Sequence, residues 1–126
     1  MFCKEDVIRF SVMDVILIDK PISKEQLKVS AQELFGDMVK GVVDIEKGIM
    51  AIGGELHADE EAFLLARDSR QEDLWGINLY PDRELSDMIE FDSMINIRPR
   101  QNNRSRGVED PTIRERIINI ARELVR

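Results

Sequence analysis

Four arginines near the C-terminal end of the chain are the residues whose types and spacing most suggest binding chemistry. They are Arg98, Arg100, Arg104 and Arg106. No acidic residue lies between Asp92 and Glu109, so these positive charges are not balanced locally. Guanidinium groups present planar forks of N–H donors that match the oxygens of phosphate and carboxylate groups. The pattern therefore predicts an anion-binding loop over residues 98–107, to which the N-terminus of a following helix would add backbone N–H donors.

The ligand of this loop would be a phosphate-bearing molecule or a short stretch of RNA. The side chains that we expect to contact it are Arg98, Arg104, Arg106, Asn103, Asn96 and Tyr80. The alternative is that the arginines pair with acidic residues of this chain, such as Glu72 and Asp73, or with those of a second copy. The segment matches no named phosphate-binding motif and contains no lysine, so the sequence leaves both interpretations open.

A second candidate site is the run Glu55, His57 and Asp59, which contains the only histidine of the chain. If residues 55–57 are extended, Glu55 and His57 share one face and Asp59 follows just beyond it. Two carboxylates and one imidazole could hold a divalent metal, or His57 could act as an acid or base beside a carboxylate. The structural alternative is a histidine that is hydrogen-bonded at a strand end, with Asp59 as a helix cap. The sequence identifies no cofactor.

Composition narrows the class of protein. The chain has 126 residues, enough for one domain with a real core, and a formal net charge of −7, which disfavours non-specific binding to nucleic acid or to anionic membranes. The single cysteine, Cys3, cannot form an internal disulfide. No signal-peptide pattern and no apolar run long enough to cross a membrane is present. These features predict a cytoplasmic protein.

The elements that must position these residues follow from periodicity and from capping signals. The sequence predicts a strand after Met13, helices opened by Ser23, Asp59 and Asp110, a hairpin from Met38 to Leu56 with a turn at Gly48, and strands at 74–80 and 88–98. Residues 1–12 are expected to form a loosely ordered N-terminal extension, and residues 13–126 a single domain.

This order, β-α-β-β-α-β-β-α, predicts an α+β fold with a four- or five-stranded, mostly antiparallel sheet and helices packed on one face. Alternation along the strands leaves the other face polar, as either a solvated surface or a site. The residues expected on this face are Lys40, Asp44, Glu55, His57, Asn78, Tyr80, Glu90, Asp92, Asn96 and Arg98.

From about Met13 onward the chain resembles a family of small uncharacterised prokaryotic proteins, classed as a domain of unknown function. The runs that carry the resemblance are GGELHAD at 53–59, QEDLWGINLYP at 71–81, EFDSMINIRP at 90–99 and NRSRGVEDP at 103–111. The family has no established activity, so the resemblance implies no catalytic role for any residue here.

Three hypotheses for the function remain. The first is an anion-binding module that uses the loop 98–107. The second is a structural or interaction protein that uses the same loop at the interface of a homo-oligomer or with another partner. The third is a hydrolase assisted by a metal or by His57, which requires that His57 and the arginines meet in one cleft.

Overall fold

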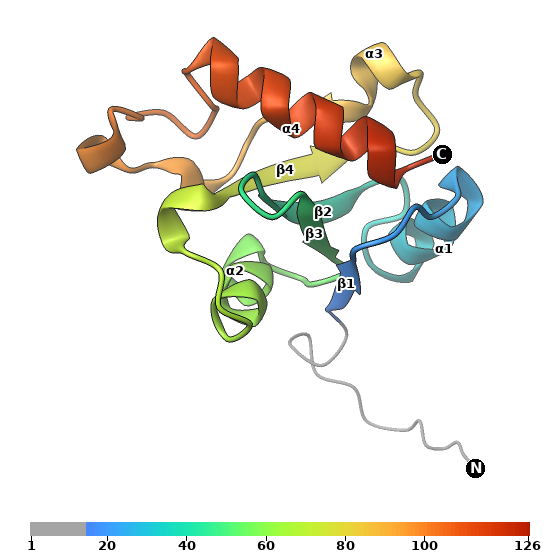
Figure 1. The fold of residues 1–126 in the computed structure, drawn as a ribbon. Helices are drawn as coiled ribbons and strands as arrows, with labels where there is room; N and C mark the ends of the chain where they lie inside the picture. Colours follow the sequence, from blue (N-terminus) through green and yellow to red (C-terminus); the bar gives the residue numbers. More distant parts are fainter. Residues whose placement is uncertain (1–14) are drawn as a thin grey trace.

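One antiparallel sheet of five strands forms the centre of the computed structural model, which describes residues 15–126 (Figure 1). The strands are β1 (Ile16–Ile18), β2 (Val39–Asp44), β3 (Ile49–Ile52), β4 (Leu74–Leu79) and β5 (Ile89–Glu90). Their order across the sheet is β1-β3-β2-β4-β5. The predicted hairpin is present as β2 and β3, and Gly48 takes a φ of +70° in its turn. The single α+β domain with a five-stranded sheet is confirmed.

Four helices surround the sheet: α1 (Lys24–Leu34), α2 (His57–Leu65), α3 (Leu85–Met88) and α4 (Pro111–Leu124). The predicted caps explain where the two longest begin. The Ser23 hydroxyl accepts from the N–H of Gln26, whose side chain accepts from the Ser23 N–H in return. At α4, the Asp110 carboxylate accepts from the N–H of Thr112.

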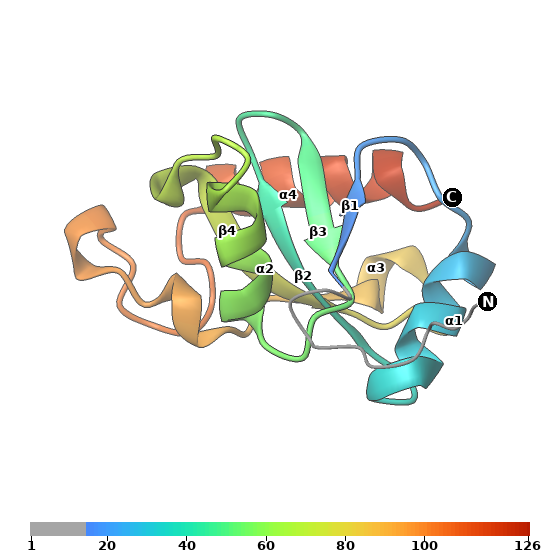
Figure 2. The ribbon, with the colours of Figure 1, turned by 90° about the horizontal axis from the view of Figure 1, so that it is seen from below.

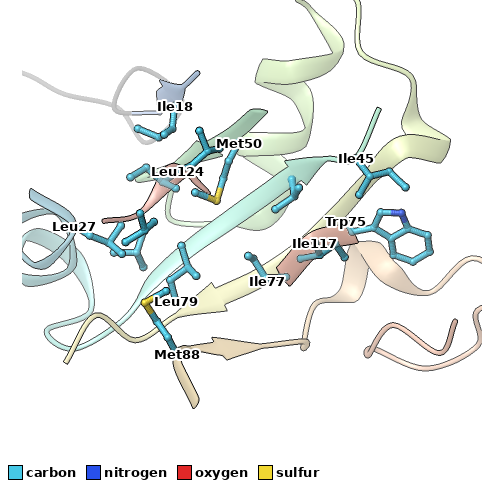
Figure 3. Close-up of a cluster of buried hydrophobic side chains, with 14 of the residues drawn as sticks. Ile18, Leu27, Ile45, Met50, Trp75, Ile77, Leu79, Met88, Ile117 and Leu124 are labelled. Atoms are coloured by element: carbon cyan, nitrogen blue, oxygen red, sulfur yellow. The ribbon is translucent and has the colours of Figure 1, made fainter. Parts of the chain in front are cut away.

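The larger hydrophobic core lies between the sheet and the helices α1 and α4 (Figure 3). Leu27 of α1 and Ile117 of α4 are fully buried there, against Met50, Ile77 and Leu79 of the strands. Each such side chain contributes about 1.5–3 kcal/mol by burial. This face of the sheet is covered by helices as predicted.

Helix α2 differs from the prediction, because it packs on the opposite face of the sheet (Figure 2). Leu64 of α2 is buried there with Val42 and Leu74, in a second and smaller core. Adjacent residues of a strand point to opposite faces, so the pairs Val42-Val43 and Leu74-Trp75 place apolar side chains on both sides. The sheet is therefore covered by helices on both faces near Val42 and Leu74. Further along the second face, near Lys40 and Asn78, the surface is polar.

The predicted strand at 88–98 is mostly absent, since β5 has two residues and a 3₁₀ turn (Met94–Asn96) follows it. The Ser93 hydroxyl accepts from the N–H of Ile95 and caps that turn. Serine side chains that bond to nearby backbone compete in this way with a strand ladder.

The expected N-terminal extension lies outside the described residues. Within residues 15–126, no helix has both the length and the apolar character needed to cross a membrane.

Candidate functional site

A cleft of about 520 Å³ opens at the polar end of the sheet face that α2 covers elsewhere. Lys40, Asn78 and Glu90 are cross-strand neighbours on β2, β4 and β5, so their side chains point to this same face. The start of α2 and the 3₁₀ turn at 94–96 form the other walls. The polar residues that line the cleft are Lys40, His57, Asn78, Tyr80, Glu90, Asp92, Ser93 and Arg106, and the apolar ones are Met38, Leu56, Ala58, Met94 and Ile95.

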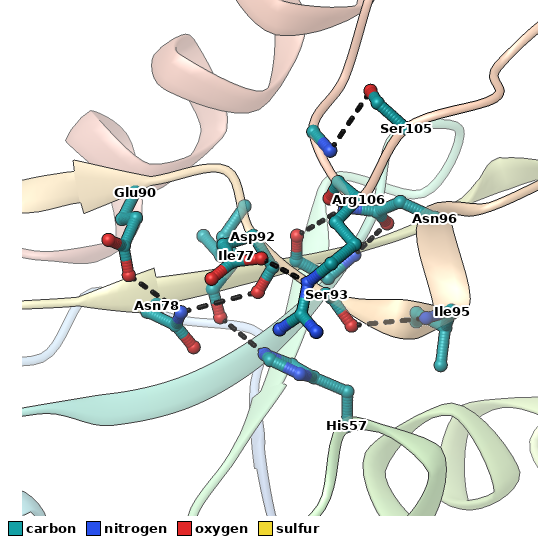
Figure 4. Close-up of polar contacts among 12 residues, drawn as sticks. His57, Ile77, Asn78, Glu90, Asp92, Ser93, Ile95, Asn96, Ser105 and Arg106 are labelled. Carbon is teal, nitrogen blue, oxygen red and sulfur yellow. Dashed lines mark hydrogen bonds and ion pairs between the residues drawn. The ribbon is translucent and has the colours of Figure 1, made fainter.

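Arg106 is the arginine of the loop that lines this cleft. Its Nε lies 2.6 Å from Oδ1 of Asp92, and its remaining guanidinium nitrogens point toward His57 (Figure 4). Its backbone carbonyl accepts from the N–H of Ser93 and from the side-chain amide of Asn96, both at 2.9 Å. The residue is held at both ends, so the position of its guanidinium relative to the cleft is defined.

His57 is the first residue of α2, and its imidazole lies against β4. Its Nε2 is 2.9 Å from the carbonyl oxygen of Ile77. A carbonyl oxygen can only accept, so Nε2 carries the hydrogen and donates it. Burial lowers the pKa of His57 below its ordinary value, and the charge of Lys40 acts in the same direction, although the hydrogen bond to Ile77 opposes both. The ring is therefore neutral near pH 7, and the lone pair is on Nδ1.

Ser93 and His57 approach each other over Gly76, but not in a way that activates a nucleophile. A Cβ at Gly76 would lie 2.6 Å from the Ser93 Oγ and 3.2 Å from Cδ2 of His57. The nitrogen next to Cδ2 is Nε2, which already donates to Ile77. It has no lone pair with which to accept the proton of Ser93.

Glu90, which lines the cleft, accepts hydrogen bonds from two side chains. Its Oε1 accepts from the amide of Asn78 at 2.9 Å and from the hydroxyl of Tyr80 at 3.2 Å. Burial, and after it the charge of Glu90, raise the pKa of the Tyr80 phenol above its ordinary value, so Tyr80 stays protonated at neutral pH. The Oδ1 of Asn78 is buried and has no hydrogen-bond partner among the residues described.

Arg98 lies outside the cleft and attaches the loop to β4. Its guanidinium stacks over the ring of Trp75 at 4.2 Å and donates to the backbone carbonyls of Gln71 and Leu74. Burial lowers its pKa below the ordinary value. These contacts account for Arg98 as a structural residue.

Asn96 and Asn103 shape the loop from inside. The side-chain amide of Asn96 accepts from the N–H of Gly76 at 2.8 Å and donates to its carbonyl at 3.0 Å, in the place that a longer β5 would take. Asn103 donates to the carbonyl of Gly107 and accepts from the N–H of Glu109, both at 2.8 Å. Both side chains are buried, so neither faces a ligand.

Arg104 is exposed and does not line the cleft. Its backbone N–H and that of Ser105 both donate to a carboxylate oxygen of Glu109, each at 2.9 Å. The hydroxyl of Ser105 and these backbone groups lower the pKa of Glu109. Two backbone donors of the loop are thus engaged by a carboxylate of the chain itself. At the start of α4, where the sequence predicts donors for an outside anion, the N–H of Thr112 donates to Asp110.

The structure does not bring Glu55, His57 and Asp59 together. Residues 55–57 do not form the extended segment that the prediction requires, because residues 55 and 56 lie in a bend and α2 begins at His57. Asp59 lies in the first turn of α2 instead of capping it. Glu55 is exposed and outside the cleft. No group of three or more His, Cys, Asp or Glu side chains among residues 15–126 is arranged to hold a metal ion.

The polar sheet face predicted from the sequence includes many of the residues that line the cleft, but not all of them. Six residues expected on that face line the cleft: Lys40, His57, Asn78, Tyr80, Glu90 and Asp92. Ser93, Met94 and Ile95 were missed, because they belong to the 3₁₀ turn, or cap it, where a strand was predicted. The other apolar residues of the wall, Met38, Leu56 and Ala58, carry no signal in the sequence that would assign them to a site. Asp44 was placed on the face, but it is buried in the hairpin turn, where it accepts from the N–H groups of Glu46 and Lys47.

The fold and the cleft define a small α+β protein with a polar cleft at the end of its sheet. A family model described as "Protein of unknown function (DUF5674)" matches residues 16–124, and the chain belongs to this family. The search of curated proteins and the search of solved structures found no match to the chain.

Proposed function

We propose that this protein binds a small anionic molecule in the cleft and that Arg106 is the residue that holds it. The observation that carries the proposal is the geometry of Arg106. Its Nε is engaged by Asp92, and its terminal nitrogens face the cleft beside a neutral His57 (Figure 4). Two parallel N–H donors of a guanidinium match the two oxygens of a carboxylate or a phosphate.

The shape and the other walls of the cleft support a small molecule rather than a polymer. Its volume of about 520 Å³ falls in the usual range for small-molecule sites. Leu56 and Met94 are 56% and 65% exposed at its walls, so they give a ligand apolar surface to cover. Lys40 adds a second cation. A ligand with an anionic group and an apolar part would contact both kinds of surface.

The test compares two arginines of the same loop. Thermal shift and calorimetry would be run with inorganic phosphate, acetate and isocaproate on the wild type, on Arg106→Ala and on Arg104→Ala. Arg104 is exposed and outside the cleft, so it reports the effect of losing one charge from the loop. We expect binding to weaken about tenfold or more in the Arg106 variant, since a charged hydrogen bond contributes roughly 1.5–3 kcal/mol. Equal losses in both variants, or no binding by any anion, would reject the proposal.

A second function is favoured by the position of the loop tip. The segment around the 3₁₀ turn Pro99–Gln101 projects away from the body of the molecule (Figure 2), and Arg100 and Arg104 are exposed there. We propose that this tip docks on an acidic surface of another protein or of a second copy. Arg100→Glu combined with Arg104→Glu should then lower the mass measured by light scattering, and an unchanged mass would count against homo-oligomer docking.

The hydrolase hypothesis gains less support. Of the arginines, Arg106 shares the cleft with His57, whereas Arg98 and Arg104 do not line it. We therefore make binding, rather than catalysis, the first function to test.

A further inference from the structure

The charges that line the cleft are balanced, and this limits the kind of ligand that it suits. Two cations, Lys40 and Arg106, and two carboxylates, Glu90 and Asp92, line it, together with a neutral His57. A simple anion would gain from the cations but would be repelled by Glu90. A ligand that is itself neutral overall, with separated positive and negative groups, would meet an opposite charge at each end.

We propose that the ligand of the cleft is a small zwitterion, an amino acid or a close analogue with an apolar side chain, whose acid group binds Arg106 and whose amino group binds Glu90. This proposal rests on the proposed function and names the class of ligand that it takes. It goes further by assigning a role to the acidic wall of the cleft.

The spacing of the acidic wall fits two separate subsites. Glu90 and Asp92 are two residues apart along an extended chain, and the side chain of Phe91 between them packs into the core on the other face. Two residues of extended chain span roughly 7 Å, so Glu90 and Asp92 start from separate points along this wall, and Glu90 can contact a different group of the ligand from the guanidinium bound to Asp92.

Glu90 is placed to receive a donor from the ligand. Its Oε1 accepts from Asn78 and Tyr80, while no hydrogen bond from another described residue reaches Oε2. Glu90 is exposed and lines the cleft, so Oε2 is the oxygen that remains for a ligand. An ammonium group carries three N–H donors and matches an open carboxylate oxygen.

Asn78, beside Glu90, has no N–H donor left for a ligand. Asn78 is 6% exposed and uses its amide N–H group on Glu90 and on the carbonyl of Asp92. Its Oδ1 has no partner among residues 15–126. Because this Oδ1 is buried, the acceptor that the wall offers to a ligand is the carboxylate of Glu90. A carboxylate accepts from an amine and does not bind another carboxylate.

The apolar side of the cleft gives the ligand its third feature. Met38, Leu56, Met94 and Ile95 line it. An aliphatic side chain would cover part of the exposed surface of Leu56 and Met94. The combination of a guanidinium, an open carboxylate and an aliphatic wall describes an apolar amino acid better than a sugar phosphate or a nucleotide.

The experiment separates the two charged groups with four ligands that keep the same isobutyl group. They are leucine, isocaproate, which lacks the amine, isoamylamine, which lacks the acid, and leucine amide, which keeps the amine and has a neutral amide in place of the acid. Binding would be measured by calorimetry at fixed ionic strength on the wild type, Glu90→Gln and Arg106→Ala. Glu84→Gln is the matched control, because Glu84 is exposed, lies near β5 in the sequence and does not line the cleft. Melting temperatures without ligand would verify that each variant is folded.

We expect leucine to bind about tenfold or more tightly than isocaproate and isoamylamine, and Glu90→Gln to remove its advantage over isocaproate alone. Glu84→Gln should leave the order of affinities unchanged. Equal binding of leucine and isocaproate, both lost in Arg106→Ala, would overturn the zwitterion and leave the anion site intact. Binding of isoamylamine as tight as that of leucine, unaffected by Arg106→Ala, would overturn both proposals.

Discussion

Arg106 and Asp92 form an ion pair, Nε to Oδ1 at 2.6 Å, that joins the end of the arginine-rich loop to the residues that follow β5. Asp92 takes one edge of the guanidinium and leaves the other edge toward the cleft (Figure 4). The same pair cancels most of the charge that the loop brings to this site. Recognition at the cleft therefore depends on directed hydrogen bonds more than on the net charge of the loop.

The first prediction concerns the stability that this ion pair contributes. The side chains of Arg106 and Asp92 are 53% and 42% exposed, so water and salt screen their attraction. Replacing Asp92 with Asn should lower the free energy of unfolding by no more than about 1 kcal/mol, as for other exposed pairs. Urea denaturation with and without 1 M NaCl measures this, and salt at ~1 M should remove most of the difference because the Debye length falls to about 3 Å.

Asp82→Asn is the matched control, because Asp82 forms a comparable exposed pair with Lys28 at 3.3 Å. A loss above about 2 kcal/mol in Asp92→Asn alone would show that the pair holds the loop together, and not only the guanidinium.

The second prediction concerns the crowding at Gly76. A Cβ at this position would lie 2.6 Å from both Cβ and Oγ of Ser93, closer than atoms tolerate. Gly76→Ala should therefore force Ser93 away from β4 and lower the free energy of unfolding by about 1–3 kcal/mol or more. Thermal or urea denaturation measures the change.

Gly41→Ala tests the same substitution on the neighbouring strand β2. A Cβ there would meet its nearest atoms at 3.5–3.6 Å, which is ordinary contact. We expect this variant to change the free energy of unfolding by less than about 1 kcal/mol in either direction. If both variants lose stability equally, a general effect of alanine in the sheet would explain the result, and the clash with Ser93 would not.

The parts of the fold that follow local rules could be predicted from the sequence. The capping box at Ser23, the cap at Asp110 and the turn at Gly48 all depend on residues within a few positions of one another, and all three are present. The alternation in β2 and β4 also placed Lys40 and Asn78 on the correct face.

The parts that depend on distant contacts could not be predicted. Residues 91–98 have the alternation of a strand, but the side-chain amide of Asn96 bonds to Gly76, twenty positions away, and replaces the missing ladder. His57 lies in the cleft because α2 crosses the second face of the sheet, which its weak apolar pattern does not reveal. The sequence could not distinguish the roles of the arginines. In the structure, Arg98 stacks on Trp75, whereas Arg106 lines the cleft.

The third prediction concerns Glu60, which is fully buried in α2. Its Oε2 accepts from the N–H of Gly54 at 2.9 Å, while Oε1 has no partner among the residues described. Burial raises the pKa of Glu60 well above its ordinary value, against the smaller effects of the Gly54 N–H and of Lys40. The folded state thus binds a proton that the unfolded state has lost, so stability falls as the pH rises above about 4.5, the pKa in the unfolded chain.

Glu60→Gln should remove this dependence, because glutamine keeps the acceptor for Gly54 and has no proton to lose. Relative to the wild type, the variant should gain free energy of unfolding as the pH rises from 5 to 8. Glu33→Gln, an exposed position on α1, controls for the loss of one negative charge. Parallel stability curves for the wild type and Glu60→Gln over this range would contradict the assignment of a buried neutral acid.

The fourth prediction concerns His57 and can be read directly, because it is the only histidine in the chain. Burial lowers its pKa, so its NMR titration midpoint should lie below the ordinary value of about 6.5. The folded state then binds fewer protons than the unfolded state, and the contribution of His57 to stability should be lost as the pH falls below that value. The Nε2 hydrogen bond to Ile77 further requires that long-range ¹H–¹⁵N correlations show the Nε2–H tautomer. A midpoint at or above that of an unfolded peptide would contradict burial as the dominant effect on this pKa. A hydrogen on Nδ1 would mean that Nε2 holds the lone pair and does not donate to Ile77.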